Sequence, residues 1–136
     1  MNDVELIKEA FEARKQSYCP YSEYAVGAAL LTKEGKVYHG CNIENAAFGP
    51  SICAERTAIF KAVSEGEHDF EMIAIVGGNI NGEVNDFAYP CGVCRQVMRE
   101  FCDEDSFQII VAIDEDTYLK KSLRELLPFG FGPENL

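Results

Sequence analysis

The sequence predicts an α/β fold of three layers, with helices on both faces of a mixed sheet of about five strands. Apolar runs of strand length alternate with helix-periodic stretches throughout the chain. One of these runs, residues 25–31, is almost continuously apolar, which is typical of a strand buried on both faces. No repeat or linker interrupts the pattern, so we expect a single domain over residues 1–136.

The first third of the chain predicts one helix and a hairpin. Apolar residues recur at helical spacing over residues 4–16, and Asp3 is available as the N-cap. The apolar run 25–31 is then the first strand. Residues 33–36, with the sequence Lys-Glu-Gly-Lys, suit a hairpin turn, and the second strand is expected over residues 37–42.

The middle of the chain predicts two further strands and two helices. A helix is expected from Cys53 to about residue 63, and strands over residues 72–76 and 107–113. A helix over residues 91–101 separates these two strands. A strand, a helix and a second strand in succession imply that the two strands pair in parallel.

The end of the chain predicts a last strand and a short helix. The strand is expected near residues 117–119. Ser122 followed by Glu125 is a capping-box pattern that opens a helix, and Pro128 ends it.

Composition limits the classes of partner. With 12 basic and 23 acidic residues, the net charge is -11, which disfavours nucleic acid because phosphate contacts dominate that affinity. A small uncharged substrate suits this surface better. No apolar run approaches the ~18 residues of a membrane span, and the amino terminus lacks signal-peptide features, so we expect a cytoplasmic protein whose six cysteines stay reduced.

Three cysteines have the pattern of a catalytic zinc site. The sequence Cys-Ala-Glu-Arg at residues 53–56 is followed by Pro-Cys-Gly-Val-Cys at residues 90–94. Cys53, Cys91 and Cys94 would supply three thiolates to a tetrahedral ion and leave one place for water, whereas a structural zinc is normally closed by four protein ligands.

A closed structural zinc is the alternative for this cluster. Its fourth ligand would come from a cysteine or histidine elsewhere in the chain, namely Cys19, Cys41, Cys102, His39 or His68. Zinc ribbons use two Cys-x-x-Cys pairs about 15 to 20 residues apart. Here a single ligand precedes a single pair by 38 positions, which favours the catalytic site. Cys19 and Cys102, each beside an aromatic residue, are expected to be small core hydrophobes.

Two residues beside the first ligand have expected roles. Glu55 is placed to take a proton from the water that zinc would bind, although an isolated glutamate there would be an ordinary first-turn residue. Arg56, three residues after Cys53, can turn back toward its sulfur and offset the charge of three thiolates. Arg95 is a weaker candidate for the same charge compensation.

The paired motifs resemble the signature of the zinc-dependent nucleoside and nucleobase deaminases. The three cysteines and the short chain are similar to the small homotetrameric cytidine deaminases, and the resemblance runs from about residue 21 to residue 133. It implies a three-layer cytidine deaminase-like catalytic domain with one zinc per subunit. It also implies hydrolytic deamination of cytidine and deoxycytidine to uridine and deoxyuridine with release of ammonia, as in pyrimidine salvage.

The resemblance also implies a substrate site shared between subunits of a homotetramer. The segment Asn42-Ile43-Glu44 is similar to the family segment that binds the ribose hydroxyls. Tyr24 stands where the family commonly has phenylalanine, and it is expected to stack on the pyrimidine. Phe131 matches a carboxy-terminal phenylalanine that reaches a neighbouring subunit's site.

Two other functions remain open from the sequence. The three-cysteine pattern also resembles that of the blasticidin S deaminases, whose chains are nearly as short. Asn42 and Glu44 favour a nucleoside as the substrate. A zinc-stabilised interaction module without catalysis is the alternative from a different class. A nucleic-acid editing role is disfavoured by the acidic charge balance.

Overall fold

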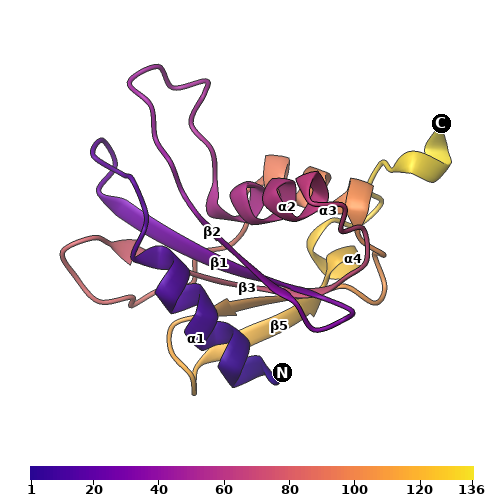
Figure 1. Ribbon diagram of the computed structural model, residues 1–136, viewed down its shortest axis with the longest axis horizontal. Coiled ribbons are helices and arrows are strands. Elements are labelled where there is room, and N and C mark those ends of the chain that lie inside the picture. The colour runs from indigo at the N-terminus through magenta and orange to yellow at the C-terminus, as the bar shows by residue number, and fades with distance from the viewer.

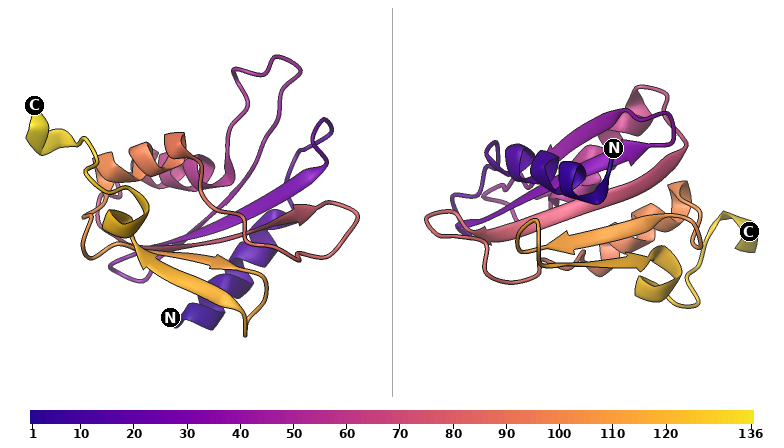
Figure 2. Two further views of the ribbon diagram at one scale, coloured as in Figure 1. Left: turned by 180° about the vertical axis from the view of Figure 1, so that it is seen from behind. Right: turned by 90° about the horizontal axis from the view of Figure 1, so that it is seen from below.

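A five-stranded sheet with the strand order β2-β1-β3-β4-β5 lies between two layers of helix in the computed structural model, which describes residues 1–136. Figure 1 and Figure 2 show α1 on one face of the sheet and α2 and α3 on the other. The elements are α1 Asp3–Arg14, β1 Tyr24–Thr32, β2 Val37–Cys41, α2 Ala54–Ser64, β3 Phe70–Asn79, α3 Gly92–Phe101, β4 Gln108–Ala112, β5 Tyr118–Ser122, α4 Leu123–Leu126 and the 3₁₀ helix η1 Pro133–Asn135.

The sheet is mixed, as the sequence predicts. β1 pairs antiparallel with β2 across the expected hairpin, where Gly35 adopts the positive φ of 95° that the turn requires. β1 also pairs antiparallel with β3, and β4 with β5. β3 and β4 pair in parallel, as the helix between them implies. The predicted three-layer α/β architecture is therefore confirmed.

Successive residues of the central strands enter two separate cores. In β1, Leu30 belongs to the core under α2 and α3, and Leu31 belongs to the core under α1. The same alternation occurs in β3, where Ile73 and Ile75 face one core and Ala74 faces the other. Both faces are buried, which explains the near-continuous apolar runs in the sequence.

The helix caps agree with the sequence at one end of the chain and differ at the other. α1 is capped by Asn2, not by Asp3: the Asn2 Oδ1 accepts from the Glu5 N–H at 2.8 Å, and the Glu5 carboxylate accepts from the Asn2 N–H at 3.1 Å. This reciprocal pair satisfies two amides, so the helix begins one residue earlier than expected. The capping box predicted at Ser122 is confirmed at the start of α4.

Gly40 determines how closely α2 approaches the sheet. A Cβ at this position would lie 2.2 Å from the Ala54 carbonyl oxygen and 2.9 Å from the Ala58 Cβ, so no larger residue fits. The first turn of α2 therefore rests directly on β2. No helix in the structure combines the length and the hydropathy that a membrane span requires.

Candidate metal centre and active site

The three predicted ligands come together at two helix N-termini. Cys53 is the N-cap of α2, Cys91 is the N-cap of α3, and Cys94 lies in the first turn of α3. Their sulfur atoms all lie within 4.8 Å of one another, and the Sγ atoms of Cys53 and Cys91 are 3.8 Å apart. Two thiolates on a tetrahedral zinc with Zn–S bonds of about 2.3 Å are separated by about 3.8 Å. The sulfur positions therefore fit a zinc ion.

The protonation of these thiols also fits a divalent cation. The pKa of Cys53 is lowered to about 5, first by a hydrogen bond from the Cys94 thiol and then by Arg56. The pKa of Cys94 is raised by that same hydrogen bond and by burial. The hydrogen bond between the two thiols favours one thiolate beside one neutral thiol, because adjacent thiolates repel each other. A bound dication would allow all three sulfurs to ionise.

None of the proposed fourth ligands joins the cluster, which contains only Cys53, Cys91 and Cys94. Cys19 and Cys102 are buried, as expected of core residues. The His39 Nε2 lies 2.7 Å from the Glu9 carboxylate, on the other side of β2. A metal ion held by this cluster would therefore have three protein ligands, which is typical of a catalytic zinc site.

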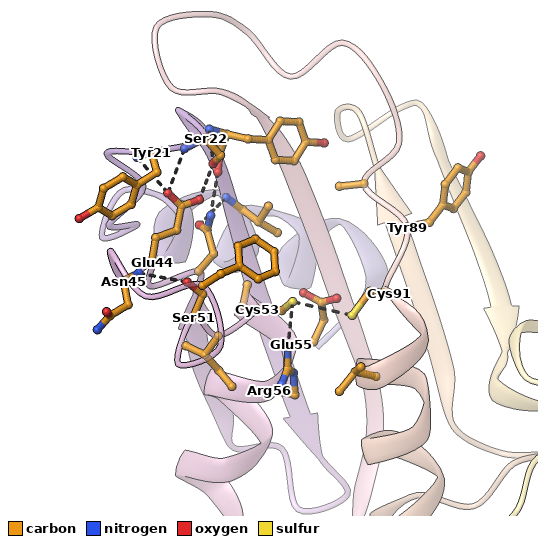
Figure 3. A pocket seen from close by; sticks show the side chains of 18 of the residues that line it. Tyr21, Ser22, Glu44, Asn45, Ser51, Cys53, Glu55, Arg56, Tyr89 and Cys91 are labelled. Carbon is orange, nitrogen blue, oxygen red and sulfur yellow. Dashed lines mark hydrogen bonds between the residues drawn. The ribbon is translucent and has the colours of Figure 1, made fainter.

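Glu55 lies in the first turn of α2, beside the sulfurs, and its carboxylate projects toward the same space in Figure 3. The residue is only 4% exposed. Burial raises the pKa of Glu55 to about 7, with a further contribution from the Cys53 thiolate. A carboxyl group with a pKa near neutrality can both accept and donate a proton at physiological pH, which is the property that a general acid and base needs.

The two candidate arginines have different partners. The Arg56 Nη2 donates to the Cys53 Sγ at 3.4 Å, as the spacing of three residues predicts. Arg95 instead donates to two backbone carbonyls, those of Pro90 and Leu126, both at 2.7 Å. Arg95 therefore holds the loop before α3 and the end of α4. The role of Arg56 in charge compensation remains a prediction.

We expect Arg56→Gln to lower kcat about tenfold or more, the effect of losing one hydrogen bond to a charged group. The matched control is Arg95→Gln, which removes a guanidinium that touches no sulfur. This control is expected to reduce thermal stability and to leave kcat within about threefold, since the Arg95 guanidinium bonds backbone carbonyls and not the reacting groups. Steady-state kinetics and zinc content check both variants. Equal kcat losses in the two variants would contradict a specific role for Arg56.

A cavity of about 1010 Å³ opens above the sulfurs and Glu55. Of the 20 residues that line it, 12 are hydrophobic, which suits a flat ligand with few polar groups. Several of these residues were not expected from the sequence: Tyr21, Ser22, Ser51, Phe87, Ala88 and Tyr89. The aromatic residues just before Pro90 could have been suspected, because the chain must pass the site to deliver Cys91 to it.

The residues expected to bind substrate divide into two groups. Tyr24, Asn42 and Glu44 line the cavity, whereas Ile43 and Phe131 do not. The Ile43 backbone pairs with that of Ile52, and successive residues of such extended chain point in opposite directions. Ile43 therefore faces away when its two neighbours face the cavity. The Ile43 side chain does not line the cavity, and the part that this residue plays in substrate binding stays a prediction.

Asn42 and Glu44 each keep unused hydrogen-bonding capacity. The Asn42 Oδ1 accepts from the Val26 N–H at 2.9 Å, and its Nδ2 donates to the Tyr24 carbonyl at 2.7 Å, which leaves one Nδ2 hydrogen free. The Glu44 carboxylate accepts from the N–H groups of Tyr21 and Ser22 at 3.1 Å and 3.0 Å, and from the Ser22 hydroxyl. These bonds, drawn in Figure 3, lower the pKa of Glu44. The carboxylate is therefore ionised and can accept one more donor.

Comparison with known proteins identifies the family. Residues 1–109 match the family model described as the cytidine and deoxycytidylate deaminase zinc-binding region. The chain belongs to this family. It is 47% identical over 135 residues to the cytidine deaminase of Sporosarcina psychrophila, covering 98% of this chain and 95% of that one. It is 41% identical to a probable cytidine deaminase of Dictyostelium discoideum, covering 100% of this chain and 90% of that one.

Solved structures of the deaminase family have the same fold. The crystal structure of a cytidine deaminase from Burkholderia pseudomallei superposes with a TM-score of 0.87 at 42% identity, covering 96% of this chain and 100% of that one. A cytidine deaminase from Mycobacterium tuberculosis superposes with a TM-score of 0.78 at 35% identity, covering 94% and 95%. The zinc-binding family and the three-cysteine cluster together support zinc as the metal.

Proposed function

We propose that this protein is a zinc-dependent cytidine deaminase that hydrolyses cytidine and deoxycytidine to uridine and deoxyuridine with release of ammonia. One observation carries the proposal: a buried glutamate with a raised pKa lines the same cavity as Cys53 and Cys91 of the three-sulfur cluster. A structural zinc site needs neither the glutamate nor the cavity. The cytidine deaminase relatives, which match over nearly the whole chain, support the same reaction.

The side chains at the floor of the cavity have distinct tasks in this mechanism. When bound, zinc supplies a Lewis acid that lowers the pKa of a water molecule toward about 7. A water molecule adds through its oxygen to C4 of the pyrimidine; Glu55 accepts the proton that this water loses and delivers it to the ring nitrogen N3. The same carboxyl group then takes the proton of the new C4 hydroxyl and gives it to the amino group, so that the C4–N bond breaks, ammonia leaves and the C4 carbonyl of uridine forms. Arg56 keeps positive charge beside the Cys53 sulfur throughout.

The sugar is held at the opposite wall of the cavity. Asn42 offers its remaining Nδ2 hydrogen, and Glu44 offers its remaining acceptor site, so one ribose hydroxyl can accept and donate at the same time. Tyr24, at 40% exposure, presents an aromatic face to the pyrimidine. The apolar walls exclude water from the reacting atoms.

The proposal also covers the oligomeric state, the cellular location and the metabolic role of the protein. The protein acts as a single catalytic domain, residues 1–136, in a homotetramer with one zinc per subunit. Phe131 from one subunit completes the cavity of another, which agrees with its 56% exposure and its absence from its own cavity wall. The enzyme works in the cytoplasm, in pyrimidine salvage, on small nucleosides and not on nucleic acid.

Comparison of two substrates tests the proposed specificity. We expect kcat/KM for cytidine to exceed that for blasticidin S by about 100-fold or more. Asn42 and Glu44 both line the cavity, and a substrate that leaves these polar groups without hydrogen bonds is disfavoured. The comparison is needed because a blasticidin-S deaminase from Bacillus cereus is 32% identical over 132 residues. Release of ammonia and the loss of cytosine absorbance measure both reactions. Preferred turnover of the antibiotic would reverse the assignment.

A further inference from the structure

Arg99, on α3, is a buried cation that takes no part in the metal centre. Its side chain is only 7% exposed, its Nε lies 3.3 Å from the Glu104 carboxylate, and its Nη2 pairs with Glu134. A buried guanidinium is costly unless carboxylates neutralise it, so these two ion pairs hold the side chain in one position, although its Nε makes no hydrogen bond. Glu104 follows α3, whereas Glu134 lies in η1 near the end of the chain. Arg99 therefore ties the last residues to the domain.

Gly132 packs directly on this guanidinium. A Cβ at this position would lie 2.3 Å from the Arg99 Nη1 and 2.4 Å from its Cζ. A free arginine would move aside, but Arg99 is held by two carboxylates. The φ of Gly132 is -143°, an extended conformation that any residue adopts, so the glycine serves to give space and not to relieve backbone strain.

The backbone on either side of Gly132 is held as well. The Gln96 Nε2 donates to the Phe131 carbonyl at 2.8 Å, and the Gly132 N–H donates to the Asn135 Oδ1 at 2.8 Å. The Phe131 side chain itself remains 56% exposed. Residues 128–136, here named the C-terminal arm, thus have an anchored backbone and an outward-facing aromatic ring.

The C-terminal arm points away from the cavity of its own chain. Figure 1 and the left panel of Figure 2 show it projecting beyond α3, on the opposite side from the loop that joins β2 to α2. That loop, with Glu44 and Phe48, forms one wall of the cavity. Because Phe131 does not line the cavity of its own chain, it would enter an equivalent cavity only on another molecule.

We propose that Arg99 is a positioning residue that fixes the C-terminal arm so that Phe131 enters the cavity of a second copy of this chain. The proposal rests on the cytidine deaminase function proposed above. The cavity suits this occupant, since about 1010 Å³ is more than a nucleoside fills and most of its lining is hydrophobic. An arm that is already ordered loses little entropy when it docks, which is how Arg99 contributes to substrate affinity without touching the substrate.

Hybrid assemblies test this proposal. Chains with Phe131→Ala keep Glu55 but lack the aromatic ring, and chains with Glu55→Gln have the opposite defect. The two are co-expressed with different affinity tags, and only assemblies that contain both are purified. Each active cavity in such a hybrid can receive Phe131 only from a Glu55→Gln chain. Phe131→Ala alone is expected to raise KM for cytidine about tenfold, the effect of one lost aromatic contact.

The Arg99 substitution is then introduced into the donor chain, which is the Glu55→Gln chain that supplies Phe131. With Glu55→Gln as the donor, we expect the hybrid to regain a KM close to that of the unsubstituted enzyme. With Glu55→Gln and Arg99→Ala together in the donor, we expect KM to stay raised, while kcat per active cavity is the same in both hybrids. The matched control is Arg124→Ala in the donor, because Arg124 also pairs with Glu104 but its ion pairs and side-chain hydrogen bonds are with Glu104 and Asp105, not with the arm. This control donor is expected to restore KM fully.

Each outcome separates the two proposals. If the Glu55→Gln donor restores nothing, the shared cavity is refuted, and the role of Arg99 with it. If donors with and without Arg99→Ala restore KM equally, the shared cavity stands and the role of Arg99 is refuted. If Arg99→Ala chains do not assemble, Gly132→Ala in the donor decides, because its Cβ displaces the arm and removes no charge. Full restoration by that donor would overturn the proposal.

Discussion

Replacement of Glu55 by glutamine is expected to lower kcat for cytidine by about 10²–10⁴-fold, the usual contribution of a general acid and base. Glutamine keeps the size of the side chain and some of its hydrogen bonds, but it cannot carry a proton. Glu55 is buried at the cavity floor and is not one of the three clustered ligands, so zinc content and fold are expected to be unchanged. Steady-state kinetics, metal analysis and circular dichroism measure the three quantities.

A matched control is available on β3. Glu71 is exposed, and Glu71→Gln removes the same charge from a residue that has no contact with the cavity. We expect this variant to keep the kcat of the unsubstituted enzyme. A Glu55→Gln enzyme whose kcat remained within about tenfold of normal, well short of the usual general acid–base contribution, would eliminate Glu55 as the proton carrier.

Replacement of Cys91 by serine is expected to abolish activity through loss of the metal. A hydroxyl group at the N-cap of α3 can still cap the helix, but it does not ionise to give the thiolate that zinc requires. Two remaining sulfurs hold zinc weakly. Bound zinc also stabilises the fold by mass action, by about 2.7 kcal/mol when free zinc is 100 times its Kd. Cys91→Ser, or removal of zinc by a chelator, is therefore expected to lower the Tm.

Cys41→Ala is the control for this experiment. Cys41 is a buried cysteine at the end of β2 and would be a candidate fourth ligand if the site were closed. Because it lies outside the three-sulfur cluster, its replacement is expected to leave zinc content and kcat unchanged. Native mass spectrometry, which counts chains and metal ions together, is expected to give four chains with four zinc ions for Cys41→Ala and no bound zinc for Cys91→Ser. Zinc loss from Cys41→Ala would point to a closed structural site.

The ligands of the candidate site are predictable because their chemistry is local. Cys53 and Glu55 share one helical turn, and so do Cys91 and Cys94. A spacing of one helical turn can be read directly from the sequence, and the structure keeps the two residues of each pair within one turn. The same holds for the hairpin at Gly35 and the capping box at Ser122. The start of α1 was misplaced by one residue, because Asn2 and Asp3 are both good caps and only Asn2 has a reciprocal partner at the right distance.

The wall of the cavity was less predictable because it joins distant parts of the chain. Glu44 binds the backbone of Tyr21 and Ser22, and Tyr89 comes from the loop that follows β3. These residues meet only because β1 lies between β2 and β3, an order that no local pattern encodes. The ion pair of Arg99 is not visible in the sequence for the same reason, since its partner Glu134 is 35 residues away.

Sequence alone determined which atoms can bind the metal and which carboxylate stands beside them, because those residues are held together by single turns of helix. Tertiary structure decided three further matters: the separation between the sulfurs of two different helices, the absence of a fourth protein ligand, and the burial that raises the pKa of Glu55. Each depends on how α2 and α3 pack on the sheet. Distances and desolvation between residues remote in sequence are properties of that packing and of no shorter segment.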